Sequence, residues 1–493
     1  MMETPDILLK IAKQRQTRIH QNGAAQGLSL PSQRDVPVVP FSTHNGSTNS
    51  IIIAEVKRRS PSAGAIAAEL EPVSLARQYH DAGFHRVSVL TEQDHFGGSL
   101  ADLREVKTAH PNLAVLRKDF LLHEEDVDVS WRAGADAILL IAALLEPSVL
   151  MLMHRRAEAL GLECLVEVHN VQEVERIRAL KPSLVGINSR DLRTFAVDPL
   201  SPLETRAAID WPCSVVYESG LSEATDVQFV RGSGFDGFLA GEALARDPDQ
   251  ASVFAKTWLK QGEAQKQYGI WKRLYDQCMP QRPLVKICGL TSVHDAQMAL
   301  HHGADLLGFV LAESPRRVSL DALRDCRNLP GIKTGVISLK ANEPMPSYVE
   351  ELLDDGVLDW IQFHGSEAPS LVRSYPGYKA IRPRTVAGVE AMDAAGSPGV
   401  LVDAFHPELA GGTGRQVDAE LLDAVAQRRQ PWIAGGLHSE NVAAIVNRWK
   451  PGLVDVSSGV ESQPGKKNED AVKQFILHAH QGYDISVVSE EKR

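Results

Sequence analysis

The chain has 493 residues, which is too long for one ordinary hydrophobic core and predicts two domains of roughly 200 to 250 residues each. Its formal net charge of -11 argues against a polyanionic nucleic acid as the main partner, although a small phosphorylated substrate needs only a local cationic site. Hydrophobic residues make up 43% and are interspersed with charged ones, as in a soluble globular protein, and no apolar run approaches the ~18 residues of a membrane span.

The amino-terminal residues 1–23 have the spacing of an amphipathic helix and lack the apolar core of a signal peptide. The cysteines contain no C-x-x-C pair, and their number is odd, which indicates a reduced setting. They are Cys164, Cys213, Cys278, Cys288 and Cys326. We therefore expect a cytoplasmic protein.

Short apolar segments alternate with longer segments of helical spacing throughout the first half of the chain. Residues 147–160, for example, have helical spacing and begin with proline. The apolar segments are continuous rather than alternating, which favours a parallel sheet covered by helices. The predicted strands are 51–57, 86–91, 113–118, 136–141, 162–168, 183–188, 213–218 and 236–240.

The second half repeats this plan. Its predicted strands are 284–288, 305–311, 332–338, 358–363, 378–382, 399–403, 431–434 and 453–457. Eight strands in each half, each followed by a helix, predict an α/β fold of two (β/α)8 TIM barrels in tandem. A doubly wound open sheet is the alternative, but its G-x-G-x-x-G fingerprint after the first strand is absent from both halves.

A polar segment with helical stretches, residues 260–283, lies between the two sets of strands and ends at Pro280 and Pro283. We interpret it as a helical linker. The predicted division is a first barrel with an N-terminal helical extension at 1–263, a linker at 264–282 and a second barrel at 283–493.

One loop pattern occurs in both halves. A segment with glycine follows the seventh strand of each, in ESGLSEATDVQFV from Glu218 and in AGGLHSENVAAIV from Ala434, and each eighth strand ends in small residues. In barrels, the loops after strands seven and eight commonly bind phosphate through backbone N–H groups, which small residues let approach closely. Turn chemistry alone is the alternative, but the recurrence at the same strands favours two phosphate sites.

The strand ends of the first half carry ionic and polar residues. In IIIAEVK, Glu55 and Lys57 lie two positions apart, so they point to the same face of a strand. A structural ion pair would explain that one strand end. The other ends supply Glu92, Lys118, Glu167, Asn188, Arg190, Glu218 and Ser219. Since buried charges are costly unless they serve one another or a ligand, this convergence predicts a polar active site at the carboxyl ends of the strands.

The motifs AEVKRRSPSAG, VLRKDF, LVEVH, GINSRDL and ESGL resemble indole-3-glycerol-phosphate synthase over essentially all of residues 1–263. The resemblance implies decarboxylation and ring closure of 1-(2-carboxyphenylamino)-1-deoxyribulose 5-phosphate to indole-3-glycerol phosphate. This substrate carries a carboxylate and a phosphate, and its carbonyl needs a proton donor. Lysines in a crowded cationic pocket can have a lowered pKa and act as such donors.

By this resemblance, Lys118 is the general acid of ring closure, and Lys57 binds the substrate carboxylate. Glu167 stabilises developing positive charge or acts in dehydration, and Glu55 orients the lysines. The remaining implied contacts are Asn188 and Arg190 to the substrate, and Ser60, Ser219, Gly220 and Gly241 on the phosphate side. Many relatives have serine where this chain has Glu242, whose carboxylate must turn away from a phosphate.

The second half carries VKICGLT, LGFVLAESPRRVS, IQFHGSE, VLVDAF, IAGGL and VDVSSGVE. These motifs resemble phosphoribosylanthranilate isomerase across about 283–482. The implied reaction is an Amadori rearrangement, which needs one acid and one base. Cys288 matches the family's base and Asp403 its acid, whereas a lone cysteine is otherwise most often a small buried hydrophobe. The implied binding residues are Arg316, His364, Gly411, Gly412, Gly414, Gly436, Ser457, Ser458 and Gly459.

The two resemblances together imply a bifunctional enzyme of tryptophan biosynthesis, a carboxy-lyase and an isomerase, in which the second half makes what the first half consumes. We expect no cofactor and no metal, small phosphorylated anthranilate-derived substrates, no nucleic acid or membrane partner, and a monomer. The alternatives are another phosphosugar-processing tandem barrel, or a chain in which one barrel is catalytically inactive and only senses phosphate.

Overall fold

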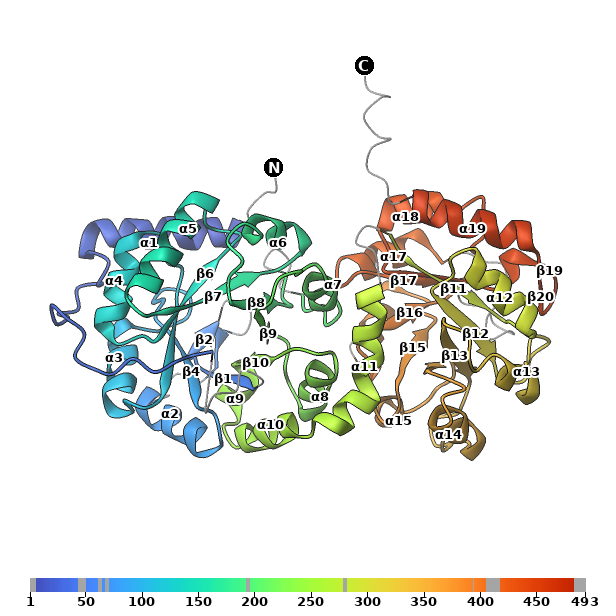
Figure 1. Ribbon diagram of the computed structural model, residues 1–493, viewed down its shortest axis with the longest axis horizontal. Coiled ribbons are helices and arrows are strands. Elements are labelled where there is room, and N and C mark those ends of the chain that lie inside the picture. Colours follow the sequence, from blue (N-terminus) through green and yellow to red (C-terminus); the bar gives the residue numbers. More distant parts are fainter. Residues whose placement is uncertain are drawn as a thin grey trace, which may run out of the picture. The chain divides into compact units, whose positions relative to one another are not determined.

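The computed structural model describes residues 6–42, 50–60, 64–66, 71–191, 196–277, 282–392, 394–404 and 417–482. The chain divides into two compact units, Met1–Tyr275 and Asp276–Arg493. Each unit is built around its own closed barrel of eight parallel strands (Figure 1). The predicted fold class is therefore confirmed. No helix among these described ranges is long and apolar enough to cross a membrane.

The first barrel pairs its strands in the order β1-β10-β9-β8-β7-β6-β5-β4. The strands are β1 (Ile51–Val56), β4 (Arg86–Leu90), β5 (Ala114–Lys118), β6 (Ala137–Ile141), β7 (Glu163–Val168), β8 (Leu184–Asn188), β9 (Ser214–Glu218) and β10 (Gly237–Ala240). The barrel closes where β1 pairs with both β4 and β10. Apolar side chains such as Ile51, Leu116 and Val216 form a buried cluster on these strands.

Helices surround this barrel, and a short hairpin, β2 (Arg59–Ser60) and β3 (Gly64–Ala65), follows β1. The helices are α2 (Pro72–Asp81), α3 (Leu100–Ala109), α4 (Glu124–Ala133), α5 (Pro147–Ala159), α6 (Val171–Ile177), α7 (Ser201–Ala207), α8 (Ala224–Gly232), α9 (Glu242–Arg246) and α10 (Gln250–Leu259). Local sequence defines several helix starts, since the side chains of Ser99 and Asn170 accept backbone N–H groups from the first turns of α3 and α6.

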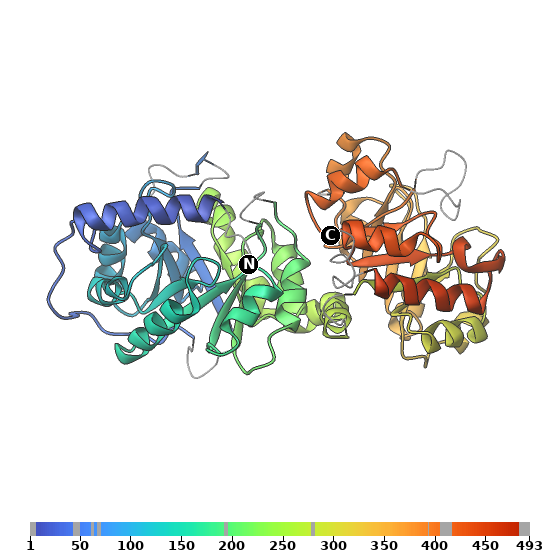
Figure 2. The ribbon, with the colours of Figure 1, turned by 90° about the horizontal axis from the view of Figure 1, so that it is seen from above.

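An additional helix, α1 (Asp6–Asn22), precedes the first barrel and lies along it (Figure 2, dark blue). Its anchor is Arg15, whose guanidinium contacts Asp119 Oδ2 at 2.8 Å and Asp126 Oδ1 at 2.6 Å. These three side chains are almost completely buried. Asp119 directly follows β5, so the network fastens α1 beside the carboxyl end of that strand.

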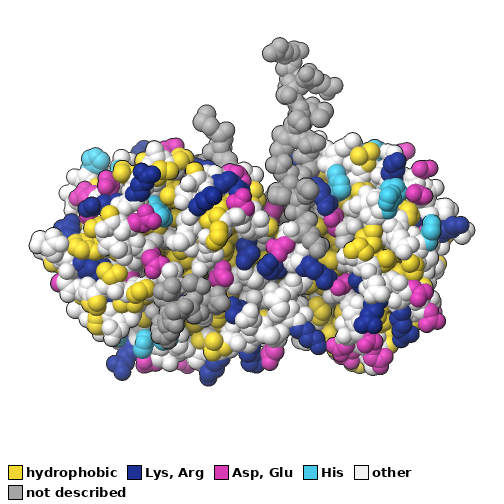
Figure 3. Space-filling model, in the orientation of Figure 1, with side chains coloured by type: hydrophobic (Ala, Val, Ile, Leu, Met, Phe, Trp, Pro, Cys, Tyr) yellow, Lys and Arg dark blue, Asp and Glu magenta, His cyan; other side chains and the backbone are white. Residues whose placement is uncertain are grey.

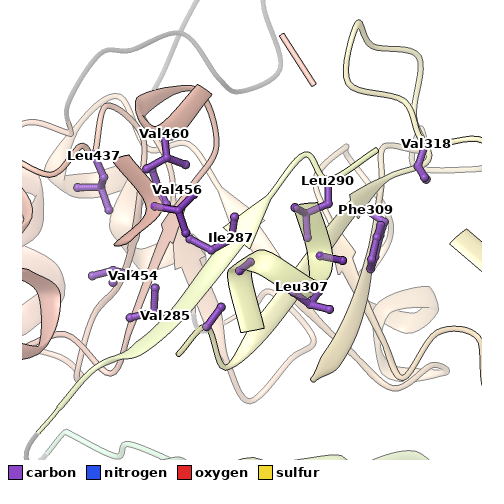
Figure 4. Close-up of a cluster of buried hydrophobic side chains, with 14 of the residues drawn as sticks. Val285, Ile287, Leu290, Leu307, Phe309, Val318, Leu437, Val454, Val456 and Val460 are labelled. Atoms are coloured by element: carbon purple, nitrogen blue, oxygen red, sulfur yellow. The ribbon is translucent and has the colours of Figure 1, made fainter. Parts of the chain in front are cut away.

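The second barrel has strand order β11 to β18 in sequence. The strands are β11 (Leu284–Cys288), β12 (Leu306–Val310), β13 (Ile332–Ile337), β14 (Trp360–Phe363), β15 (Gly377–Ile381), β16 (Val400–Val402), β17 (Trp432–Ala434) and β18 (Leu453–Val456). Side chains such as Val285, Ile287, Leu307 and Val454 form its main apolar cluster (Figure 4).

Helices also cover the second barrel, and a hairpin, β19 (Glu461–Gln463) and β20 (Lys466–Lys467), follows its last strand. The helical segments are α12 (Val293–His301), α13 (Leu320–Asp325), α14 (Ser347–Asp354), α15 (Pro369–Arg373), α16 (Val386–Val389), η1 (Glu390–Met392), α17 (Ala419–Ala426), α18 (Val442–Trp449), η2 (Ser458–Val460) and α19 (Glu469–Gln481). Three buried aromatic rings, Trp360, Tyr378 and Trp432, pack edge-to-face against one another inside this unit.

Helix α11 (Gln261–Gln277) occupies most of the segment between the two sets of strands. It packs on α8, where the ring of Phe229 lies 5.8 Å from Tyr268 and 6.0 Å from Trp271, both edge-to-face. Gly232 permits this approach, because a Cβ at that position would collide with the carbonyl oxygen of Ala264. Most of this segment therefore packs as part of the first unit.

Charged side chains of both signs are interspersed over the face of the molecule seen in Figure 3.

Candidate active sites

A cavity of about 490 Å³ opens at the carboxyl ends of the strands of the first barrel. It brings together nine residues predicted from the sequence: Glu55, Lys57, Lys118, Glu167, Asn188, Arg190, Ser219, Gly220 and Gly241. Apolar residues of α1 and of the loops complete its wall: Ile7, Leu8, Ile11, Phe96 and Phe120. The side chain of Ser60 lies outside the described part of the structure. The cavity is lined by both charged and apolar side chains.

The lining of the cavity includes the ion pair of Glu55 and Lys57, with Nζ 2.7 Å from Oε1. The two side chains meet because their positions two apart at the end of β1 face the same way. Burial opposes ionisation of Glu55, but the ammonium groups of Lys57 and Lys118 outweigh it and lower the pKa of this carboxyl group. Glu55 is therefore a carboxylate at neutral pH.

Lys118, at the end of β5, lies between two carboxylates. Its Nζ is 2.5 Å from Glu218 Oε2 and 3.6 Å from Glu167 Oε2. Burial favours the neutral amine, yet the negative charges of Glu218, Glu167 and Glu55 outweigh it and raise the pKa of Lys118. The expectation of a lysine with lowered pKa in a cationic pocket is wrong for this residue, because its immediate neighbours are anionic.

Glu218 is a member of the site that the sequence placed at a strand end without giving it a role. Burial raises its pKa to about 7, with Lys118 opposing this shift and Glu167 adding to it. A carboxyl group that titrates near neutral pH in direct contact with a lysine is typical of acid–base sites. The signal in the sequence was the same one that identified Glu167, a carboxylate at the end of an apolar strand.

Glu92, another of the predicted ionic strand ends, has a different role. Its carboxylate accepts backbone N–H groups from Asp94, His95 and Phe96 at 3.0, 2.7 and 3.0 Å, and it pairs with Arg18 of α1 at 3.2 Å. It does not line the cavity. The reading of Glu92 as part of the polar cluster is therefore corrected, since it holds a loop and the N-terminal helix.

On the proposed phosphate side of the first cavity, the backbone turns tightly and leaves little room for side chains. Ser219 and Gly220 have φ of 70° and 75°, which an ordinary side chain adopts at a cost. A Cβ on Gly220 would lie 2.5 Å from Val197 Cγ1, and one on Gly241 would collide with Glu55 Oε1. The carboxylate of Glu242 pairs with Arg246 at 3.0 Å.

The second barrel places Cys288 at the end of β11, where it is 8% exposed. Its Sγ would lie 2.7 Å from a Cβ on Gly308 of the neighbouring strand, so glycine makes room for the thiol. Burial raises the pKa of Cys288, while the ammonium groups of Lys286 and Lys467 oppose that rise. Lys286 in turn contacts Asp455 at 2.7 Å and Gln362 at 2.6 Å beneath the thiol's strand end.

Asp403, just after β16, is buried and held on both sides. His364 Nε2 lies 3.1 Å from its Oδ2, and the backbone N–H of Ala404 donates to its Oδ1 at 2.8 Å. Gly435, with φ of 83°, lets the β17 loop pass close by, since a Cβ there would lie 2.8 Å from Asp403 Oδ1. His364, predicted as a substrate contact, therefore also orients the predicted acid.

Arg316 is held by residues that sequence reasoning missed. Glu461 of β19 accepts from its Nε at 3.0 Å and from its Nη2 at 2.9 Å, and also from Lys467 Nζ of β20 at 2.9 Å. A Cβ on Gly289, next to Cys288, would lie 3.0 Å from Arg316 Cδ and 3.5 Å from Lys467 Nζ. The hairpin thus supplies Lys467 and, through Glu461, holds Arg316 near Gly289, the residue next to Cys288.

Four other predicted residues of the second barrel lie after its last two strands: Gly436, Ser457, Ser458 and Gly459. Gly436 has φ of 63°, and a Cβ on Gly459 would collide with the carbonyl oxygen of Leu437. Ser457 is at the N-cap position of η2, and Ser458 is the first residue of that helix. Gly411, Gly412 and Gly414 lie outside the described residues. Within the described ranges, no group of three or more His, Cys, Asp or Glu is arranged to bind a metal ion.

Two barrels, each with acid–base side chains at the carboxyl ends of its strands, define a tandem (β/α)8-barrel enzyme. Residues 8–256 match the family model of indole-3-glycerol phosphate synthase, and residues 285–478 match that of N-(5'-phosphoribosyl)anthranilate isomerase. The chain belongs to both families, one in each barrel.

Proteins similar to this chain include a multifunctional tryptophan biosynthesis protein of Phycomyces blakesleeanus, 31% identical over 87% of this chain and 62% of its own length. A tryptophan biosynthesis protein of Phytophthora nicotianae is 31% identical over 82% of this chain and 87% of its own length. An indole-3-glycerol phosphate synthase of Geobacillus thermodenitrificans is 46% identical over 40% of this chain and 77% of its own length.

The chain spans 62% and 66% of the length of two of the multifunctional relatives, from Phycomyces blakesleeanus and Schizosaccharomyces pombe. Among solved structures, phosphoribosylanthranilate isomerase of Thermotoga maritima is 32% identical over 40% of this chain and 98% of its own, with a TM-score of 0.35.

Proposed function

We propose that the chain catalyses two consecutive steps of tryptophan biosynthesis. The second barrel isomerises N-(5-phosphoribosyl)anthranilate to 1-(2-carboxyphenylamino)-1-deoxyribulose 5-phosphate, and the first decarboxylates and cyclises that product to indole-3-glycerol phosphate. The observation that carries this proposal is the match of each barrel to one of these two enzyme families. The acid–base groups at both barrel mouths support it.

In the synthase, the charges of the cavity suit a substrate with an anion at each end. Lys57 and Arg190 would bind the carboxylate, and the Ser219–Gly220 turn with Gly241 would take the phosphate on backbone N–H groups. The aromatic ring would lie against the apolar wall that α1 completes. Asn188, whose Oδ1 accepts the backbone N–H of Arg190 at 3.1 Å, would contact the substrate.

The proton for ring closure would come from Lys118. Because the neighbouring carboxylates raise its pKa, this ammonium stays protonated at neutral pH and carries a proton that it can donate to the substrate carbonyl. A substrate that displaces Lys118 from Glu218 would weaken that hold and make the ammonium a stronger acid. Glu167 would then stabilise positive charge on the substrate or act in dehydration, and Glu55 would keep Lys57 in place.

In the isomerase, Asp403 would protonate the ring oxygen of the ribose, and Cys288 would remove the proton from C2'. The cations Lys286 and Lys467 favour the thiolate that the base requires. Arg316, fixed by Glu461, would bind the anthranilate end. We further propose that the protein is a cytoplasmic monomer that acts on small molecules and binds no nucleic acid.

The deciding experiment assays the two reactions separately on the purified chain, each with its own substrate. We expect both activities, with Asp403→Asn removing only isomerisation and leaving the synthase rate on supplied intermediate near wild type. A chain with one activity would support the alternative of a barrel that only senses phosphate. A chain with neither would favour another phosphosugar reaction.

A further inference from the structure

We propose that His169 is a positioning residue for Glu167, which it links to Glu173 in a buried carboxylate–imidazole–carboxylate chain. This inference rests on the proposed synthase function of the first barrel. It goes beyond the residues that face the cavity, because His169 and Glu173 act only through Glu167.

The strand and the following helix together build this chain. Glu167 and His169 are two positions apart at the end of β7, so their side chains point the same way. His169 Nδ1 lies 3.0 Å from Glu173 Oε2, and its Nε2 lies 3.5 Å from Glu167 Oε1. The imidazole is thus placed between the two carboxylates.

The distal carboxylate is rigidly held. Glu173, in the first turn of α6, also accepts the backbone N–H of His169 at 3.0 Å and the side-chain amide of Asn170 at 3.0 Å. Asn170 in turn caps the helix by accepting the backbone N–H of Glu173 at 3.0 Å. With Nδ1 engaged by this fixed acceptor, the ring can offer only Nε2 to Glu167.

Among the described residues, the Nε2 atom of His169 is buried and lacks a close hydrogen-bond partner. The side chain of His169 is 11% exposed, and those of Glu167 and Glu173 are 5% exposed. In the described part of the chain, Nε2 is buried and has no hydrogen-bond partner within normal distance. Buried polar atoms are rarely left in this state, and 3.5 Å is a distance that a small movement of Glu167 would close when substrate binds.

The charges around the ring favour its protonated form. Glu173 of α6, Glu167 of β7 and Glu218 of β9 all face it, and Lys118 of β5 lies against the latter two. Although burial opposes the charge, the carboxylates outweigh it and raise the pKa of His169. Two forms then share one proton: an imidazolium beside the Glu167 carboxylate, and a neutral imidazole accepting from the Glu167 carboxyl group.

This shared proton would control Glu167 during catalysis. The imidazolium stabilises the carboxylate that a developing positive charge on the substrate needs. Where the ring is neutral, with Nε2 unprotonated, a proton that Glu167 takes up can pass to Nε2, which restores the carboxylate with no net change in the charge of the pair during the transfer.

The first test measures synthase turnover against pH for His169→Asn. Because the variant lacks a cation beside Glu167, we expect the acid limb of kcat to move to higher pH and kcat to fall roughly tenfold, less than the ~10² that follows loss of a proton donor itself. KM should change little. The matched control is His154→Asn, a largely buried histidine of α5 that pairs with Glu158 outside the cavity.

The second test does not depend on activity. The titration of His169 is followed by NMR in histidine-labelled protein, with His169→Asn used for assignment. Glu167→Gln and Glu173→Gln should each lower the pKa of the imidazole, because each removes a facing carboxylate. An unchanged imidazole titration in Glu167→Gln, or a wild-type pH profile in His169→Asn, would overturn the inference. Absence of synthase activity in the wild-type protein would instead refute the proposed function. The NMR result would still show whether His169 interacts with Glu167 and Glu173.

Discussion

At the scale of single residues, the first cavity is defined by how its charges are balanced. Lys118 is surrounded by Glu55, Glu167 and Glu218, so the group proposed as the acid is held protonated rather than poised near neutrality. The group whose pKa is brought close to 7 is its partner Glu218. Near neutral pH, the group of this pair that gains or loses a proton is therefore Glu218, while Lys118 keeps its own.

Replacing Lys118 with alanine should lower synthase turnover by ~10²-fold or more, because the substrate carbonyl then lacks its proton donor. The measurement is kcat on supplied intermediate, with circular dichroism to establish that the variant is folded. The isomerase rate of the same preparation serves as an internal control. Wild-type synthase turnover in a folded variant would remove Lys118 from the mechanism.

The raised pKa of Glu218 makes the stability of the first unit depend on pH. Its contribution is fully present below the pKa of an unfolded glutamate and is lost as pH rises through about 7, since ionisation is disfavoured only in the folded state. Lys118 stays protonated across this range. Wild type should therefore lose roughly 3 kcal/mol of free energy of unfolding, relative to Glu218→Gln, as the pH rises from acid to mildly alkaline values. Chemical denaturation at several pH values measures this, and a constant difference would contradict it.

Residue by residue, the sequence predicted which side chains share the first cavity, but not how they pair. Position at a strand end was enough for Glu55, Lys57 and Lys118 because parallel strands all end at one mouth. The same criterion failed for Glu92, whose carboxylate turns back to its own loop. It did not reveal His169, whose role depends on its contact with Glu173 in the helix that directly follows β7, or Lys467, which a hairpin from a distant part of the chain brings near Cys288.

At the scale of elements, the predicted strands agree with the observed ones to within one or two residues at each end, because continuous apolar segments mark them clearly. The β19–β20 hairpin was not predicted. Its strands are too short for a periodic signal, and tertiary bonds fix them: Thr291 Oγ1 donates to Gly465 O at 2.6 Å, and the N–H of Lys467 donates to Asp295 Oδ2 at 3.1 Å.

The turn between β10 and α9 offers a precise test of crowding. A methyl group in Gly241→Ala would collide with the Glu55 carboxylate and displace it from Lys57, so we expect a loss of synthase kcat/KM of at least ~10-fold. Gly262→Ala in α11 is the matched control, because the added methyl has no atom within 4 Å apart from its chain neighbours and the backbone of its own helix. Valine at Gly220 or Gly436 is a poorer probe, since the positive φ at both positions would strain the backbone itself.

Helix α1 should contribute to substrate binding through its anchor. Arg15→Met removes two charge-assisted hydrogen bonds and would loosen the apolar wall of the cavity, although Asp119 keeps its pair with Arg117 and Asp126 keeps two backbone N–H donors. We expect a raised synthase KM and a lower melting temperature of the first unit. Arg104→Met, which breaks a more exposed pair with Asp35, should change either quantity little. Equal effects of the two variants would argue against this role.

At the scale of the whole molecule, repetition in the sequence was sufficient to predict two barrels, since each half contains its own eight strands and its own loop pattern. The packing of α11 was not predictable in the same way. Its polar composition is typical of a linker, and its attachment depends on a few positions, Ala264, Tyr268 and Trp271, that face α8.

This packing determines where the chain can be cut. A fragment of residues 1–262 loses the contacts of Tyr268 and Trp271 with Phe229, and removal of such buried aromatic rings typically costs about 3–5 kcal/mol. A fragment of residues 1–277 retains them and should be more stable to denaturant and keep synthase activity. Two fragments of equal stability would show that α11 contributes nothing to the first unit.

The aromatic rings inside the second barrel also give that unit an optical label. The indoles of Trp360 and Trp432 lie 6.1 Å apart at an interplanar angle of 71°, so their electronic transitions couple and should produce paired circular dichroism bands of opposite sign. These bands vanish when the rings separate. The spectrum of Trp432→Phe, which lacks one of the two indoles, shows the signal without their coupling. Proteins of several domains often unfold in more than one step. The temperature at which this signal is lost therefore reports the unfolding of the second barrel separately from that of the rest of the protein.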